Sequence, residues 1–243
     1  SFLQVNLGAS LFKNLGEGSS FSEVSDTNSV DLLSDYSRKG NGYNLDAGLR
    51  YRVFLDTLKR KLEVSVNYNY YDYLNKRLTS QQTTETRYSL INNTNQSDRI
   101  TARLDAEIPF PKWKSQLNLG SKFNGQNVLS SGAYRFNDSL ELSYNSSNFS
   151  STLPFDYTES NLAGYLEWKQ RLGNKFSFTA GVRVEDFHLT GKVEGTELVS
   201  KHYLNLFPSI HTLYRITSDI LFSTSYSRKI NMPHYSQFDP NVT

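Results

Sequence analysis

The chain consists largely of stretches in which every second residue is apolar. In residues 43–56, Leu49 and Val53 alternate with Arg50 and Arg52, and similar alternation recurs along the chain. Successive side chains of a β-strand point to opposite faces, so each stretch predicts a strand with one apolar and one polar face. We predict nine strands, at residues 2–12, 43–56, 61–75, 97–109, 113–127, 158–171, 175–189, 202–216 and 219–230.

The connections between these predicted strands alternate between short and long. Four links are short (57–60, 109–112, 172–174 and 217–218), and four long polar segments are interpreted as loops (13–42, 76–96, 128–157 and 190–201). Outer-membrane barrels combine short periplasmic turns with longer outer loops. We therefore predict an all-β fold: an antiparallel up-and-down meander of about nine long strands that is part of a transmembrane outer-membrane β-barrel. The alternative that the alternation leaves open is a soluble β-sandwich.

The register of the alternation predicts which side chains share a face. One face should carry Leu45, Leu49, Val53, Leu62, Val64, Val66, Ile100, Leu104, Phe178 and Val182, and the other Arg50, Arg52, Arg103, Glu107, Arg183 and Glu185. Aromatic residues should form two belts at the membrane interfaces. Trp113, Trp168, Phe176 and Tyr214 lie near the short links, and Tyr68, Tyr70, Phe123 and Tyr226 near the long segments.

Composition narrows the class of protein further. The 16 tyrosines and 15 phenylalanines are typical of strands, and the formal net charge of +2 comes from scattered charges that indicate no nucleic-acid partner. No apolar run is long enough for a transmembrane helix. The mean hydropathy of −0.55 is compatible with membrane strands, in which only alternate residues are apolar.

Candidate chemistry is sparse. The histidines His188, His202, His211 and His234 form no close sequence pair and there is no cysteine, so a zinc site would need partners distant in sequence, and we predict no metal and no cofactor. No nucleophile elbow or phosphate loop is present, which argues against an enzyme. Acidic residues two positions from arginines, such as Asp105 and Arg103, fit the mixed-charge wall of a lumen.

Two aromatic clusters are the best candidates for ligand contact. The stretches "YNYYDY" and "LPFDY" lie where strands pass into the long segments, and tyrosine combines a stacking face with a hydroxyl group. Their residues Tyr70, Tyr71, Tyr73, Phe155 and Tyr157 are the predicted ligand-binding set. The alternative is that these side chains belong to an interfacial aromatic belt.

Three stretches in the last third of the chain form a distinctive set: "AGVRVED", "YLNLFPS" and "YSRKINMPHYSQFDP". Over about 80 residues this part of the chain resembles the barrel of TonB-dependent receptors of Bacteroidetes-type bacteria. The three stretches contain Asn205, Phe207, Pro208, Arg228, Asn231 and Pro233, for which we predict a structural role, with prolines that end the strand ladder. Met232 and "FDP" depart from the family pattern.

The resemblance implies an outer-membrane receptor for a scarce nutrient, such as a metal chelate, glycan or peptide. Its partners would be outer-membrane lipid, a plug domain of the same full-length chain, a TonB-type energy-coupling protein and a surface lipoprotein. Residues 1–243 would then be one incomplete barrel segment, which forms either an open sheet or a smaller cylinder closed by pairing 2–12 with 219–230. The alternative function is a soluble β-sheet module that binds glycan or protein through tyrosine-rich loops.

Overall fold

A computed structural model shows one nine-stranded antiparallel sheet in which each strand pairs with its neighbours in sequence. The structure describes residues 1–24, 30–57, 59–82, 86–137, 151–230 and 235–239. The predicted up-and-down meander is therefore confirmed. The elements are β1 (Phe2–Val24), β2 (Val30–Phe54), β3 (Lys61–Gln82), β4 (Thr86–Phe110), η1 (Pro111–Trp113), β5 (Ser115–Asn137), β6 (Ser151–Leu172), β7 (Phe176–Val193), β8 (Thr196–Arg215), β9 (Leu221–Ser227) and η2 (Tyr235–Gln237).

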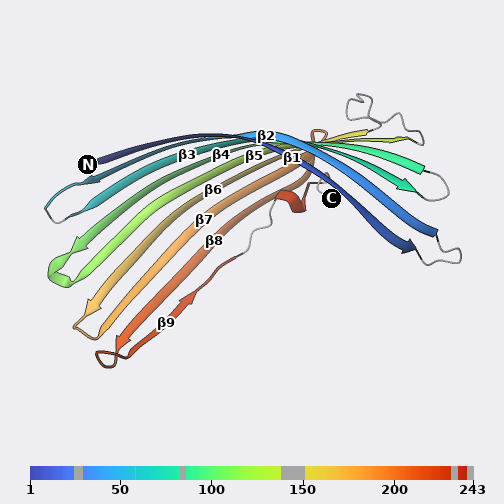
Figure 1. The fold of residues 1–243 in the computed structure, drawn as a ribbon. Helices are drawn as coiled ribbons and strands as arrows, with labels where there is room; N and C mark the ends of the chain where they lie inside the picture. Colours follow the sequence, from blue (N-terminus) through green and yellow to red (C-terminus); the bar gives the residue numbers. More distant parts are fainter. Residues whose placement is uncertain (25–29, 58, 83–85, 138–150, 231–234, 240–243) are drawn as a thin grey trace.

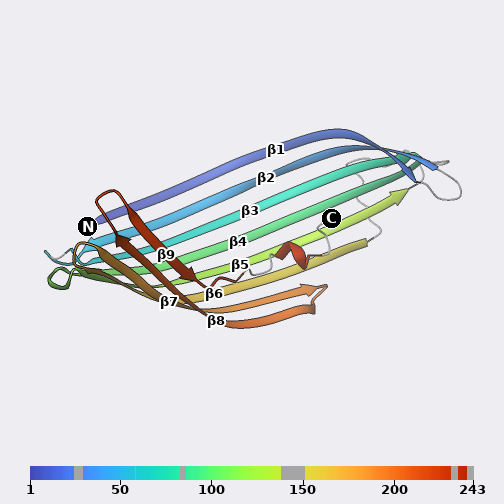
Figure 2. The ribbon, with the colours of Figure 1, turned by 90° about the horizontal axis from the view of Figure 1, so that it is seen from below.

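The sheet is strongly curved and open (Figure 1). Strands β1 and β9 lie at its two edges, and among the described residues neither pairs with the other. The segment that contains η2 folds back under the concave side, where Figure 2 shows it in front of the strands. No helix among the described residues has the length and apolar character to cross a membrane.

Most strands extend well beyond the predicted bounds. The four long segments interpreted as loops are largely strand, and β1 and β2 pair continuously from Phe2 and Arg52 to Val24 and Val30. The interpretation was wrong because these segments are mainly polar and show no sustained alternation of apolar and polar residues. The backbone hydrogen bonds of the ladder need no particular side chain, so they form there as well. The four short links are confirmed, and in Figure 1 they lie at one end of the sheet.

The hairpin between β7 and β8 corrects the predicted loop at 190–201 most completely. Strand β7 ends at Val193 and β8 begins at Thr196, so only two residues connect them. Glu194 has a φ of 51° and Gly195 a φ of 79°. Two consecutive positive φ angles define a type I′ turn, whose twist matches that of the strands it joins.

Replacing Gly195 by valine should destabilise the β7–β8 hairpin by about 1–2 kcal/mol, because the left-handed conformation brings a Cβ close to the carbonyl oxygen. Unfolding by denaturant measures the loss. Gly164→Ala is the matched control, since nothing lies within 4 Å of a Cβ added there. Equal stability of the two variants would contradict the turn assignment.

The two predicted faces are confirmed by the strand register. Leu49 lies directly opposite Val66, which lies opposite Ala102, and this row continues through Phe123. The predicted polar set occupies the other face, where Arg52 lies opposite Glu63. All ten predicted apolar residues share the convex face: Leu45, Leu49, Val53, Leu62, Val64, Val66, Ile100, Leu104, Phe178 and Val182.

Aromatic side chains border the apolar band of the convex face at both ends. Near the short links, Phe110 stacks on Trp113 at 5.7 Å between ring centroids and lies 5.7 Å from Trp168. At the other end Tyr43 and Tyr70 pack at 5.8 Å. Rings at these two levels are typical of strands that cross a bilayer, where they lie among the lipid headgroups.

Candidate functional site

The concave face near the short links carries a continuous set of ion pairs. The Arg52 Nε atom lies 2.7 Å from Glu63 Oε2, and Arg50 Nε lies 3.4 Å from Glu63 Oε1. Further pairs join Lys61 to Glu107, Arg103 to Asp105 and Arg183 to Glu185. All of these residues except Glu185 line one hollow of the concave face together with Tyr165, whose hydroxyl donates to Asp105. The mixed-charge wall predicted from residue spacing is therefore present.

Farther along the concave face, toward the long hairpins, the surface becomes apolar and closed. Phe155 and Tyr157 on β6 are completely buried, and they pack with Val128, Phe187 and Leu189. Val193, Val199, Tyr203, Tyr235 and Phe238 cover this cluster, which we call the outer cluster. Residues 235–239 thus supply part of a small core on a face that is ion-paired and polar near the short links.

Tyr235 of η2 anchors this segment to strands from both halves of the sheet. Its ring lies 6.1 Å from that of Tyr157, and its hydroxyl accepts a hydrogen bond of 3.3 Å from Asn95 Nδ2 on β4. The contact with Asn95 spans 140 residues of sequence. Residues 235–239 therefore lie within the concavity of the sheet, as Figure 2 shows, and do not extend away from it.

The hydroxyl of Tyr157 is unusual because it is buried beside a carboxylate. It donates a hydrogen bond of 2.8 Å to Glu159 Oε2. Burial raises the pKa of Tyr157, and the hydrogen bond to Glu159 raises it further. Tyr157 therefore stays neutral and keeps donating throughout the physiological range, so it contributes a fixed donor and no charge.

Four of the five predicted ligand-contact residues lie on the concave face, but in two groups. Phe155 and Tyr157 belong to the outer cluster, whereas Tyr71 and Tyr73 stack around Phe12, at 5.7 and 5.6 Å between ring centroids. Tyr70 lies on the convex face opposite Leu45, so it belongs to the aromatic belt there. The aromatic-belt alternative therefore describes Tyr70, whereas ligand contact by the other four residues stays a prediction.

The family-motif residues of β8 divide between the two faces. Asn205 lies opposite Glu185, and Phe207 opposite Arg183, on the concave side, whereas Pro208 lies opposite Val182 on the convex side. The β8–β9 ladder ends at Ser209 and Ser227, immediately next to Pro208. Beyond this point the Arg228 N–H donates to the Pro208 carbonyl at 3.3 Å. Asn231 and Pro233 lie outside the described residues.

Two features of the sites were not found from the sequence. Phe187 and Leu189 lie on the same face of β7 as Arg183 and Glu185. The change on this face from charged to apolar residues could have predicted the outer cluster. Asp186, His188 and His202 come together on the convex face, because the register of β7 and β8 pairs the two histidines. The pairing of the two histidines depends on the register between β7 and β8, which no short sequence motif shows.

A curved antiparallel sheet with an apolar, aromatic-bordered convex face and an ion-paired concave face defines a transmembrane β-barrel wall of the outer membrane. The matching family model is described as "Outer membrane protein beta-barrel family" and covers residues 54–243. The chain belongs to this family, and its location is the outer membrane. Among curated proteins none matches the chain.

The solved structures similar to this chain include one transporter and two receptors. The ferric citrate transporter FecA is 16% identical with a TM-score of 0.47, over 90% of this chain and 38% of its own. The alcaligin receptor FauA of Bordetella pertussis is 12% identical with a TM-score of 0.43, over 92% and 41%. The siderophore receptor PiuA of Acinetobacter baumannii is 11% identical with a TM-score of 0.46, over 91% and 45%. The chain thus spans less than half the length of these proteins.

Proposed function

We propose that this chain is part of the barrel of a TonB-dependent receptor that imports a scarce nutrient, such as a metal chelate, glycan or peptide. The observation that carries the proposal is the open sheet with a wet, ion-paired concave face in a member of an outer-membrane barrel family. The motif strings around Phe207, Pro208 and Arg228 support the receptor class, including its Bacteroidetes-type branch. We assign no catalytic role to any residue.

The edges of the sheet support a larger barrel. The unpaired backbone groups of β1 and β9 must find partners, because lipid offers none, and further strands of the same full-length protein would supply them. Barrels of about 22 strands have a lumen filled by a plug. The ion pairs around Glu63 and Glu107 would face such a plug. A TonB-type protein would act on the plug from the periplasm, and a surface lipoprotein would bind on the outer side.

Energy-dependent uptake tests this proposal. Cells with and without the full-length gene are given candidate chelates, glycans and peptides, and accumulation is measured with and without a protonophore. We expect one class to accumulate only when the gene is present and the proton-motive force is intact. Accumulation that needs the gene but survives the protonophore would indicate a passive pore and contradict the proposal. The soluble binding module is not favoured, because the chain belongs to a membrane family.

Tyr70 and Tyr71 are neighbours in sequence but lie on opposite faces of β3, which gives a matched test of the ligand site. Tyr71→Ala and Tyr73→Ala should each weaken binding of the imported solute to the full-length receptor about tenfold, or about 1.4 kcal/mol, because each removes a stacking face from the lumen. Tyr70→Ala, next to Tyr71 but on the convex face, should leave affinity within about twofold. Equal losses for all three would show that the tyrosines act only through folding.

A further inference from the structure

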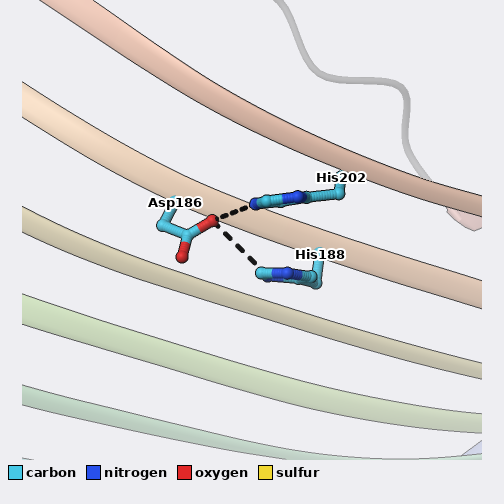
Figure 3. Close-up of side chains that lie close together, drawn as sticks. All are labelled: Asp186, His188 and His202. Atoms are coloured by element: carbon cyan, nitrogen blue, oxygen red, sulfur yellow. Dashed lines mark hydrogen bonds and ion pairs between the residues drawn. The ribbon is translucent and has the colours of Figure 1, made fainter.

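Three side chains with metal-binding groups meet on the convex face of the β7–β8 hairpin (Figure 3). His188 on β7 lies directly opposite His202 on β8, and their rings stack with centroids 3.9 Å apart and planes at 12°. Asp186 Oδ1 lies 2.6 Å from His202 Nε2 and 3.6 Å from His188 Nδ1. One ligand atom of each residue lies within 4.8 Å of the others.

The rigid backbone of this hairpin holds the three side chains together. Asp186 and His188 are two residues apart on one strand, so they share a face, and the ladder of β7 with β8 fixes His202 beside them. The type I′ turn at Glu194 and Gly195 and the register shift between Gly191 and Lys192 together set this register. The backbone therefore holds the three side chains on one face. The two rings would tilt out of their stacked arrangement to direct their nitrogens at one ion, whose bonds to such ligands are about 2.0–2.2 Å long.

The donor set suits one class of ion. Two imidazole nitrogens and one carboxylate oxygen favour Zn²⁺, Cu²⁺ or Ni²⁺ over Mg²⁺ and Ca²⁺, which prefer oxygen alone. The side chains of Asp186, His188 and His202 are 43%, 54% and 57% exposed, so a bound ion would keep positions open to water or an outer ligand. Both ion-pair partners of Asp186 in the described part of the chain are these histidines, and no lysine or arginine competes for its carboxylate there.

The cluster occupies a defined level of the barrel wall. Val184 and Leu206, one row nearer the short links, continue the apolar band, whereas Asp186 and His188 begin the polar extension of β7. With the short links on the periplasmic side, this level is the outer edge of the bilayer, among the lipid headgroups. An ion here would be reached from outside the cell and not from the lumen.

We propose that Asp186, His188 and His202 bind one divalent transition-metal ion on the outer wall of the barrel, at the level of the outer headgroups. The ion would be held by both strands of the β7–β8 hairpin and would present its remaining coordination positions outward. This site is separate from the concave face that the proposed transport would use, since Asp186 lies opposite Leu204 on the convex side.

The test measures metal binding to the full-length protein in detergent after treatment with a chelator. Zn²⁺ is titrated by calorimetry into the wild type and into the His188→Gln, His202→Gln and Asp186→Asn variants. We expect each histidine variant to lose at least tenfold in affinity for one zinc ion. His211→Gln is the control, because His211 lies opposite Thr179 on the concave face, and it should bind that ion as the wild type does.

A spectroscopic measurement on the wild type guards against variants that fail to assemble. Cu²⁺ bound at the first equivalent should show superhyperfine coupling to two imidazole nitrogens in its electron paramagnetic resonance spectrum. A wild-type spectrum without nitrogen coupling, or zinc binding that is unchanged in the doubly substituted His188→Gln/His202→Gln protein, would overturn the proposal.

Discussion

Replacing Phe155 by alanine should destabilise the outer end of the sheet by about 3–5 kcal/mol. Its side chain is completely buried, and it packs on Tyr157 at 6.3 Å between ring centroids within the outer cluster. Removing the ring leaves a cavity that the rigid strands on either side cannot close. The loss should be local, because the apolar band toward the short links contributes no residue to this cluster.

Hydrogen exchange resolved along the full-length chain measures this local loss. Amides in residues 235–239 and in the outer part of β6 should exchange faster in Phe155→Ala, whereas those near the short links should not. Leu129→Ala is the control, since Leu129 is 49% exposed on the convex face and should cost less than about 0.5 kcal/mol. Unchanged protection of 235–239 in Phe155→Ala would contradict the view that the outer cluster holds the C-terminal segment in place.

The membrane-spanning part of the fold was predictable because lipid and lumen impose opposite demands on alternate residues. Leu49 and Arg50 reveal their faces from their chemistry alone, and the pairing of β2 with β3 follows from a short link. Outside the bilayer this constraint disappears. In the outer part of the β2–β3 hairpin, around Lys39 and Asn75, both faces of the sheet meet water. The side chains there do not alternate between apolar and polar, so the sequence does not show that these residues belong to strands.

The candidate sites were predictable only where they depended on one strand. Tyr71 and Tyr73 share a face because they are two residues apart, and the same parity places Tyr70 on the opposite side. Sites made from two strands need the register as well. His188 and His202 meet because the ladder combines the two-residue turn at Glu194 and Gly195 with a register shift between Gly191 and Lys192. Without either feature, each histidine would lie opposite a different residue.

Placing an arginine at Val66 should destabilise the barrel by about 2–4 kcal/mol in lipid. Val66 lies in the middle of the apolar stretch of β3, between Leu49 and Ala102 on the convex face. A guanidinium group there must leave water for hydrocarbon or deform the bilayer to reach the headgroups. Denaturant-induced unfolding of the full-length protein in lipid vesicles, followed by tryptophan fluorescence, gives the free energy of unfolding.

Asn67→Arg is the matched control for this substitution. Asn67 is the next residue of β3, at nearly the same depth, but its side chain is exposed on the concave face beside Thr101. The same arginine there stays in a wet environment and should change the free energy of unfolding by less than about 1 kcal/mol. Both variants introduce the same arginine at nearly the same depth. The difference between their free energies of unfolding therefore measures the effect of the face on which the arginine lies. A loss of equal size in both would mean that lipid does not cover the convex face of the sheet.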